Sequence, residues 1–447
     1  MAAAVRRLAL ILVLFGMVVG PAFSQDTPPA FKFQLDLGLG VQSFNDVDVY
    51  TGNKPTVYQS LSLGPDFSFG NFGIGLDITL NYRFAGPNST FVVRPQDWVP
   101  DVPTFQNFLS LYLSKIAYVR WGEKGDPLFL KLGSFDDATL GDGFVMGDYS
   151  NTLFLPGDRH FGLQADLDGA LFNFPYLGLE SAIGNVAQLD VMGARVYVRP
   201  LVALAIPIIS NLEVGATVAV DTNPYLLTAS AGTGTTTPVA VFGGDLRLPI
   251  VNVKNVVSLV AFTDVDSIQG KSWGGMLGVG GKLISFITYG AQLRLLGENF
   301  IPVYFGPTYD LLRDQQYNIV QSSVLVTPAL VGWQASLGTS FLDDKFIFSV
   351  SIDGPFVAPT TDPTGLLSYP HVRGILSLAE GVVPLVSFDF SYDKKAIMTW
   401  ADFGTANNAA FLAKVNFKTG PAVISFYYQV TANQPPISGL LTSIALF

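Results

Sequence analysis

Few residues in this sequence have the types and spacing that enzyme chemistry requires. The chain has two histidines, His160 and His371, and no cysteine, so thiolate chemistry and disulfides are excluded. Gly270-Lys271-Ser272-Trp273-Gly274 matches the G-x-S-x-G pattern of hydrolases, whose serine lies on a sharp turn between a strand and a helix. Here a loop precedes Ser272 and no helical pattern follows it. A membrane-embedded hydrolase is therefore the weakest of the functions that we consider.

Metal and cofactor signals are also weak. Asp166, Asp168 and Gly169 hint at a calcium loop, but no full ligand set follows at loop spacing. No phosphate-binding loop or dinucleotide fingerprint is present. We expect no catalytic residues, no cofactor and no metal site, and a protein that is not an enzyme.

Charged residues of both signs recur on one face of the predicted strands, interspersed with Gly, Ser and Thr. Facing lipid, each charge would cost about 2–4 kcal/mol at the bilayer midplane, so together they predict an aqueous interior. Such an interior suits small polar solutes. The candidates for lining it are Arg83, Arg195, Arg199, Arg247, Arg294, Asp77 and Asp245. A purely structural role, in which these residues pair and hydrate the wall, stays open for each of them.

A long loop from Ser134 to Arg159 is rich in Gly and Asp. In a barrel, a loop of this length often folds inward and narrows the lumen. Its candidate constriction residues are Asp136, Asp137, Asp142 and Asp148. We expect them to oppose Arg195, Arg199, Arg247 and Arg294 as screened partners rather than tight buried pairs.

These residues must be positioned by long strands, of which the hairpin Val57–Phe84 is the clearest. From Phe72 to Phe84 apolar and aromatic residues alternate with small or polar ones, which places the two sets on opposite faces. Gly70-Asn71 forms the turn. Thirteen residues at roughly 3.3 Å each span about 43 Å, more than a soluble strand needs and enough for a tilted bilayer crossing. On the hairpin alone, a soluble β-sandwich remains the alternative.

Composition extends this interpretation to the whole chain. Its mean hydropathy is +0.39, yet after residue 24 no run of about 20 apolar residues exists, so spanning helices are not expected. Residues 1–24 read as a secretory signal peptide with Arg6 and Arg7 in its basic region. Removing these two leaves 23 basic and 35 acidic residues, a net charge of −12, which argues against nucleic acid as a partner.

Residues 25–447 are therefore predicted to form one transmembrane, antiparallel, up-and-down β-barrel. We expect about 20 strands, within a range of 16–22, joined alternately by short periplasmic turns and long extracellular loops. Among the predicted strands are 107–121 and 189–206. The long loops include 45–56, 136–159 and 297–330.

The chain ends on Phe447, and bacterial outer-membrane barrels characteristically finish on a strand with a C-terminal aromatic residue. In this feature and in its loop pattern the chain resembles porin-like outer-membrane barrels of diderm bacteria. The resemblance implies an outer-membrane location, contact with its lipid, and recognition of the last strand by the barrel assembly machinery. We expect a channel for the passive passage of small hydrophilic solutes; the alternative is a surface-exposed structural or adhesive protein with the barrel as its anchor. The sequence leaves the oligomeric state undetermined.

Overall fold

The computed structural model describes residues 31–445, with gaps at 45, 47–51, 53–55, 154, 156–158, 205, 227–236, 254–255, 323–324, 343–344, 360–368, 420–421 and 432–436. The expected signal peptide, residues 1–24, and the terminal Phe447 lie outside the described residues.

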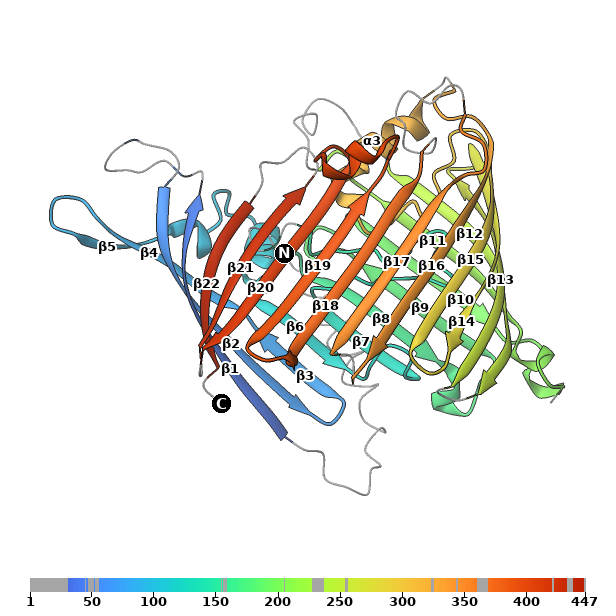
Figure 1. Ribbon diagram of the computed structural model, residues 1–447, viewed down its shortest axis with the longest axis horizontal. Coiled ribbons are helices and arrows are strands. Elements are labelled where there is room, and N and C mark those ends of the chain that lie inside the picture. Colours follow the sequence, from blue (N-terminus) through green and yellow to red (C-terminus); the bar gives the residue numbers. More distant parts are fainter. Residues whose placement is uncertain are drawn as a thin grey trace.

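One antiparallel β-sheet of 22 strands dominates the described chain (Figure 1). The strands are β1 (Phe31–Phe44), β2 (Thr56–Phe69), β3 (Phe72–Leu76), β4 (Ile78–Ala85), β5 (Thr90–Val93), β6 (Ile116–Trp121), β7 (Leu128–Gly133), β8 (Gly162–Asp168), β9 (Leu177–Ile183), β10 (Val191–Val198), β11 (Glu213–Asp221), β12 (Val239–Val253), β13 (Val257–Ile268), β14 (Ser272–Leu283), β15 (Ile287–Leu296), β16 (Leu330–Phe341), β17 (Phe346–Pro355), β18 (His371–Val383), β19 (Val386–Lys394), β20 (Ala409–Thr419), β21 (Ala422–Thr431) and β22 (Ile437–Ala445). The α-helices are α2 (Phe105–Leu113) and α3 (Tyr309–Gln321), and the 3-10 helices are η1 (Pro95–Asp97), η2 (Gly169–Phe172), η3 (Val202–Leu204), η4 (Ile209–Asn211) and η5 (Trp400–Gly404). None of these helices is both long and apolar enough to cross a membrane.

Most strands pair with their neighbours in sequence, and the last strand pairs with the first. β1 pairs with β2 on one side and, through five residue pairs, with β22 on the other. β3 and β4 both pair with β2, and β6 and β5 pair with β3 and β4 in turn. Because β3 shares one position with β4, and β5 shares one with β6, the 22 strands occupy twenty positions around the sheet. The expected up-and-down barrel of about 20 strands is confirmed.

Side chains alternate between an apolar outer surface and a polar inner one. In β10, Val196 is 46% exposed whereas Arg195 is 1% exposed, and in β15 the values are 57% for Leu295 and 6% for Arg294. This distribution is the reverse of that in a soluble protein. It is the arrangement that a barrel surrounded by lipid requires.

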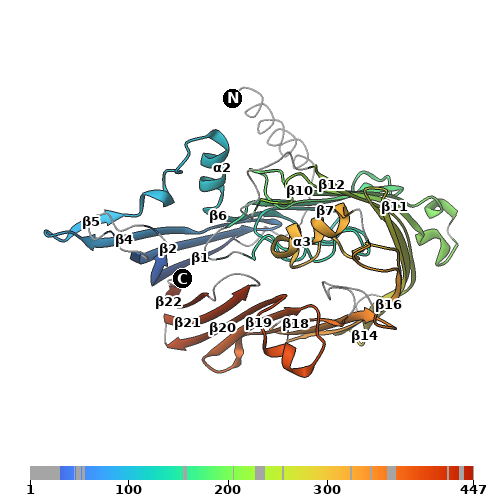
Figure 2. The same cartoon turned by 90° about the horizontal axis from the view of Figure 1, so that it is seen from above.

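Successive connections are mostly short at one end of the barrel and longer at the other. The short end includes the turns at 70–71 and 284–286, and the long end carries residues 134–161 and 297–329. Figure 2 shows α3, part of the second long connection, within the outline of the ring of strands. The alternation agrees with the parity expected from the sequence.

The single strand expected over residues 72–84 is interrupted at Asp77. β2 pairs Leu63 with Ile78 and Asp66 with Gly75, so the register is the same on both sides of the interruption. Pro65 lies opposite the break, and a proline has no N–H to donate to the ladder. The Asp77 N–H instead donates to Lys115 O over 2.8 Å. The interruption thus arises from the neighbouring strand.

Two other strand boundaries were wrong. Residues 107–121 were expected to be one strand, but Phe105–Leu113 is helix α2 and only Ile116–Trp121 is strand. The Thr104 hydroxyl accepts a hydrogen bond from Asn107 N–H, which is a helix N-cap, and the apolar residues that follow fit a helical period as well as a strand period. The strand expected at 189–206 ends at Val198 and is followed by η3.

The face assignment can be tested in the middle of β16. Leu337 is 51% exposed on the outer surface, and its neighbour Ser336 lies on the inner one, beside Gly290 of β15. We expect Leu337→Arg to lower the free energy of unfolding in lipid by about 2–4 kcal/mol, because it places a charge in hydrocarbon. Ser336→Arg is the matched control and should cost far less. Equal losses in denaturant-unfolding titrations in vesicles would show that the faces are assigned wrongly.

Candidate functional site

Residues 134–161, here called the inner loop, fold back against the inner surface of the barrel wherever the structure describes them, which is everywhere except 154 and 156–158. Leu140 approaches the inward-facing Gly193 of β10, and Val145 approaches Gly243 of β12. The glycines leave space for these side chains on the wall. The loop therefore occupies the lumen on the side of β9–β12.

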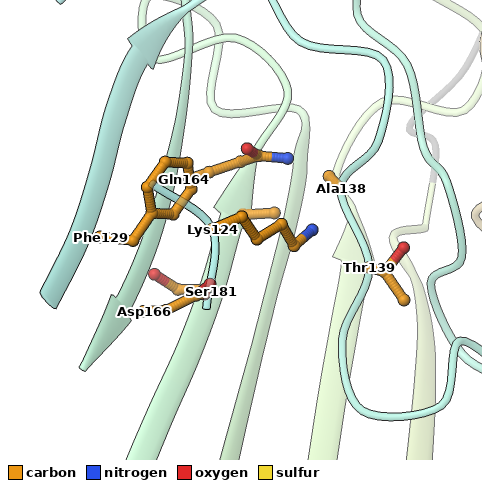
Figure 3. Close-up of a pocket in the computed structure, with 8 residues that line it drawn as sticks. Lys124, Phe129, Ala138, Thr139, Gln164, Asp166 and Ser181 are labelled. Carbon is orange, nitrogen blue, oxygen red and sulfur yellow. The ribbon is translucent and has the colours of Figure 1, made fainter. Parts of the chain in front are cut away.

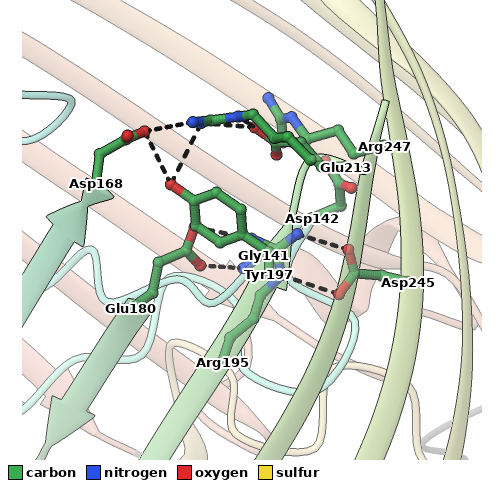
Figure 4. A network of polar contacts seen from close by, with 10 residues as sticks. Gly141, Asp142, Asp168, Glu180, Arg195, Tyr197, Glu213, Asp245 and Arg247 are labelled. Atoms are coloured by element: carbon green, nitrogen blue, oxygen red, sulfur yellow. Dashed lines mark hydrogen bonds and ion pairs between the residues drawn. The ribbon is translucent and has the colours of Figure 1, made fainter. Parts of the chain in front are cut away.

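A charged network fixes the tip of the inner loop (Figure 4). Arg195 binds Asp245 through two bonds, Nε–Oδ2 at 2.9 Å and Nη2–Oδ1 at 2.6 Å, and binds Glu180 Oε1 at 2.9 Å. The second oxygen of Glu180 accepts the Gly141 N–H over 2.7 Å. Arg195 thus holds the Glu180 carboxylate in place to accept the hydrogen bond from the loop backbone. The inner loop covers Arg195, which is 1% exposed.

Gly141 is required at this contact for two reasons. Its φ is +59°, in the left-handed region that side chains disfavour. A Cβ atom at this position would also lie 2.9 Å from Arg195 Nε. Any other residue at 141 would push the loop away from the arginine.

Two further pairs flank this contact on the same wall. The Arg247 guanidinium donates to Asp142 Oδ1 over 2.5 Å, and burial raises the pKa of Asp142 to about 6 although Arg247 opposes the shift. Nearer the short end, Arg199 bridges Asp168 at 2.8 Å and Glu213 at 2.9 Å. Each arginine that we predicted on this wall thus has a carboxylate partner.

Residues 297–329, here called the helical loop, are held by a single buried arginine of α3. Arg313 lies 2.7 Å from Asp221 at the end of β11 and 3.0 Å from Asp190 in the β9–β10 connection. Tyr309 also donates to Asp221, over 2.6 Å. Asp310 completes the cluster 3.6 Å from Arg313, and burial raises the pKa of Asp310 to about 6.

The two loops share one apolar core inside the barrel, and together we call them the plug. Met146 forms a parallel bridge with Phe305, and the two segments exchange backbone hydrogen bonds at Val303, Phe305 and Gly147. The strands that face this core are β9 to β15, through Ala182, Val191, Ala219, Val239, Val241, Ile268, Met276 and Leu296. Leu330, at the start of β16, packs against this core, and no residue of β17–β22 belongs to it in the described part of the chain.

Among the described residues, an ion pair and a hydrogen bond connect the plug to the opposite wall. Asp148 of the inner loop pairs with Arg373 of β18 at 2.5 Å. Gln429 of β21 donates to Leu153 O over 2.8 Å. On the same wall His371 lies between Asp353 and Asp393, 3.1 Å from each. A wall of paired charged side chains therefore faces the edge of the plug.

The other candidates for lining the lumen are Asp77, Arg83, Arg294 and Asp245, and each has a contact inside the barrel. Asp77 pairs with Arg159 of the inner loop. The Arg83 guanidinium lies 5.4 Å from the ring centroid of Tyr58. Arg294 is 3.5 Å from Asp353, and Asp245 is the partner of Arg195 already described.

The four predicted loop aspartates do not act as one set. Asp142 pairs with Arg247, whereas Asp148 pairs with Arg373, which is not one of the four arginines named above. Asp136 is exposed, and Asp137 accepts a hydrogen bond from Gln164 over 3.1 Å. Arg195, Arg199 and Arg294 are paired with carboxylates of the wall instead, and the Arg195–Asp245 pair is tight and buried rather than screened.

A small polar pocket lies where the inner loop leaves the wall (Figure 3). Its lining consists of Lys124, Phe129, Ala138, Thr139, Gln164, Asp166, Ser181 and Ala182. Lys124 reaches across to the Asp137 carbonyl at 2.9 Å. Asp166 therefore contributes to this pocket. Among the described residues no cluster of His, Cys, Asp or Glu is arranged to hold a metal ion, and Ser272 opens strand β14 after a turn rather than preceding a helix.

The Arg313 cluster was not identified from the sequence. Asp190, Asp221 and Arg313 are far apart in the chain, and each sits in a stretch with no spacing typical of a site. One feature of the sequence could have pointed to it: residues Tyr309–Gln321 have the pattern of an amphipathic helix, although they lie within a predicted loop. A helix in such a loop needs a surface to pack on, which in this barrel is the lumen.

The attachment of the helical loop can be tested at Arg313. Removing it leaves Asp190 and Asp221 buried without their counter-charge, so Arg313→Met should weaken docking of α3 by about 3–5 kcal/mol. Hydrogen exchange of the α3 amides should accelerate accordingly. Gln315→Met, at an exposed position of the same helix, is the matched control. Unchanged protection in Arg313→Met would mean that the apolar core alone holds the helix.

Comparisons with known proteins give only distant matches. No family model and no curated protein matches the chain. It is similar to the solved structure of Pseudomonas aeruginosa OpdL at 9% identity and a TM-score of 0.32, over 93% of this chain and 99% of that one. It is also similar to Pseudomonas aeruginosa outer membrane protein OprD (10%, 0.29, 92% of each chain) and to a BenF-like porin from Pseudomonas fluorescens Pf-5 (10%, 0.30, 93% and 98%). These structures are of the outer-membrane, porin-like class that the sequence resembles, but at such values they carry neither a family nor a function to this chain.

Proposed function

We propose that this protein is an outer-membrane channel through which small hydrophilic solutes pass passively. The observation that carries the proposal is the division of the interior: the plug packs on β9–β15, while the wall from β16 to β22 keeps charged side chains of both signs. Water beside such a wall favours small polar solutes over apolar ones. Paired charges give the passage no strong preference for one sign.

Exposure separates the residues that can meet a solute from those that support the wall. The side chains of Arg247 and Asp148 are 34% and 54% exposed, whereas those of Arg195 and Asp245 are 1% and 2% exposed. We therefore assign Arg247 and Asp148 to the passage, and Arg195 and Asp245 to positioning of the inner loop. The narrowest point lies at Asp148 and Arg373, because this ion pair links the plug to the opposite wall.

We further propose the orientation that the connections favour. The short end faces the periplasm, and the long end, with loops 45–56, 136–159 and 297–330, faces the cell surface. Residues 1–24 direct export, and the last strand together with the terminal Phe447 is recognised by the barrel assembly machinery.

A second candidate function rests on the plug itself. Its apolar core and the buried Arg313 cluster suit a lumen that stays closed, which favours a surface-exposed protein with the barrel as anchor. Electrical conductance separates the two functions.

Purified protein refolded in detergent and added to a planar lipid bilayer should produce discrete conductance steps in potassium chloride. Solutes below the size limit of the passage should enter vesicles that contain the protein, as measured by liposome swelling. Folding is checked first by heat-modifiable migration on gels. A correctly folded protein that never conducts would refute the channel and favour the anchor.

The position of the constriction can be tested with Arg373→Gln. Loss of this cation breaks the link between plug and wall and leaves the Asp148 carboxylate without its partner. We expect a larger single-channel conductance and a reversal potential shifted toward cation preference. Arg120→Gln is the control, since Arg120 pairs with Glu123 at the short end, away from the plug. If both variants conduct like the wild type, the narrowest point lies elsewhere.

A further inference from the structure

The barrel wall differs in height around its circumference. β6, β7, β8, β9 and β10 have 6, 6, 7, 7 and 8 residues. By contrast, β1 and β2 have 14 each, and β11 to β22 have between 9 and 15. A tilted strand needs about 9–11 residues to cross the hydrocarbon of a bilayer. The sector from β6 to β10 is therefore too short to cover the apolar thickness of a membrane.

Helix α2 lies at the upper edge of this short sector. It precedes β6 directly, and Gln106 donates to Ala187 O at 2.9 Å and to Gln188 Oε1 at 3.0 Å, both in the β9–β10 connection. Figure 2 shows α2 outside the ring of strands, on the opposite side of the wall from α3. With only six residues in β6 below it, α2 is within the depth that hydrocarbon occupies around the taller strands.

The helix has the composition of a lipid-contacting segment. None of its nine residues is charged. Phe105, Phe108 and Tyr112, spaced three and four apart on one face, are 42%, 37% and 48% exposed. Most soluble helices bury such a face, but none of the residues of α2 is buried.

The polar groups of this segment are used within the protein. Asn107 donates to Val102 O at 2.9 Å, the Tyr112 hydroxyl donates to Trp98 O at 3.0 Å, and Lys115 donates to Asp97 O at 2.9 Å. The Lys115 ammonium also lies 4.3 Å from the ring centroid of Trp98. What the segment leaves exposed is therefore mainly apolar and aromatic.

The exposed face continues the lipid-facing surface of the barrel. On the other side of the connection, the rings of Tyr82, Phe84 and Phe91 on β4 and β5 contact one another, and Phe84 and Phe91 are 61% and 52% exposed. Val99 and Val102, between these rings and α2, are 56% and 61% exposed. Exposed apolar and aromatic side chains thus recur from β4 across the connection to α2, with the exposed Asp101 between Val99 and Val102.

We propose that α2 is a membrane-interface helix: its Phe105, Phe108 and Tyr112 face is covered by lipid and extends the apolar outer surface where β6–β10 are too short to do so. A helix at a membrane interface lies in the plane of the interface with its apolar face toward the acyl chains. A second copy of the chain is the competing occupant, and water is the third possibility.

The absence of cysteine from the chain makes a direct test possible. Phe108→Cys is labelled with a fluorophore, the protein is reconstituted into phosphatidylcholine vesicles, and quenching by lipids brominated on the acyl chains is compared with quenching by aqueous iodide. Leu337→Cys, on the outer face of β16, is the lipid-exposed control, and Glu123→Cys, in a short-end turn, is the aqueous control.

We expect bromolipid quenching at Phe108 within about twofold of that at Leu337, and iodide quenching well below that at Glu123. Iodide quenching equal to that at Glu123 would place the helix in water and overturn the proposal. Protection from both quenchers would show that a second copy covers the face, and would overturn it as well. Tyr112→Cys reports on the same face one turn later, so a failure of Phe108→Cys to fold does not remove the test.

Discussion

The structure depends on one constraint, which is that hydrocarbon offers no hydrogen bonds to a peptide group. A sheet in a bilayer must therefore pair every strand on both sides, and an open edge would leave N–H and C=O groups unsatisfied at several kcal/mol each. The ladder between β1 and β22 meets this requirement by joining residues about 400 positions apart in the chain. The outward apolar residues and the alternation of every strand follow from the same demand, because only the side chains can then adapt to lipid on one side and water on the other.

A ring of twenty strand positions encloses a lumen that is wider than the wall side chains can fill. The plug occupies part of this lumen. The inner loop and the helical loop bury Phe144, Met146, Phe300 and Phe305 against one another and against β9–β15, as a soluble protein would build a core. Because that core covers the strands β9–β15 and not the rest of the wall, the interior is divided into an apolar, packed part and a charged part. The proposed passage of solutes runs along the charged part. The packed, apolar part sets the width of that passage.

The charged residues inside the barrel are arranged in pairs rather than as a field of one sign. Arg195 with Asp245 and Glu180, Arg199 with Asp168 and Glu213, and Arg313 with Asp190 and Asp221 each bring a cation to at least two carboxylates. Buried arginine suits this role because its planar, always charged guanidinium can satisfy two carboxylates at once. The most deeply buried pairs position the plug, and the more exposed ones, at Asp142–Arg247 and Asp148–Arg373, are left to interact with solvent and solutes.

The sequence by itself determined the barrel class, the approximate strand number and the face of most residues, because a period of two is a local property that each strand displays on its own. It also indicated that the loop from Ser134 to Arg159 is unusual. It did not reveal that Asp77 interrupts a strand, since Pro65 on the neighbouring strand is responsible, or that residues 105–113 are helical, since their apolar spacing fits both periods. The partners of Arg195 and Arg313 were decided by tertiary structure alone. Which carboxylate meets which arginine depends on the register between strands and on how two distant loops pack in one lumen, and neither is encoded within any single stretch of the chain.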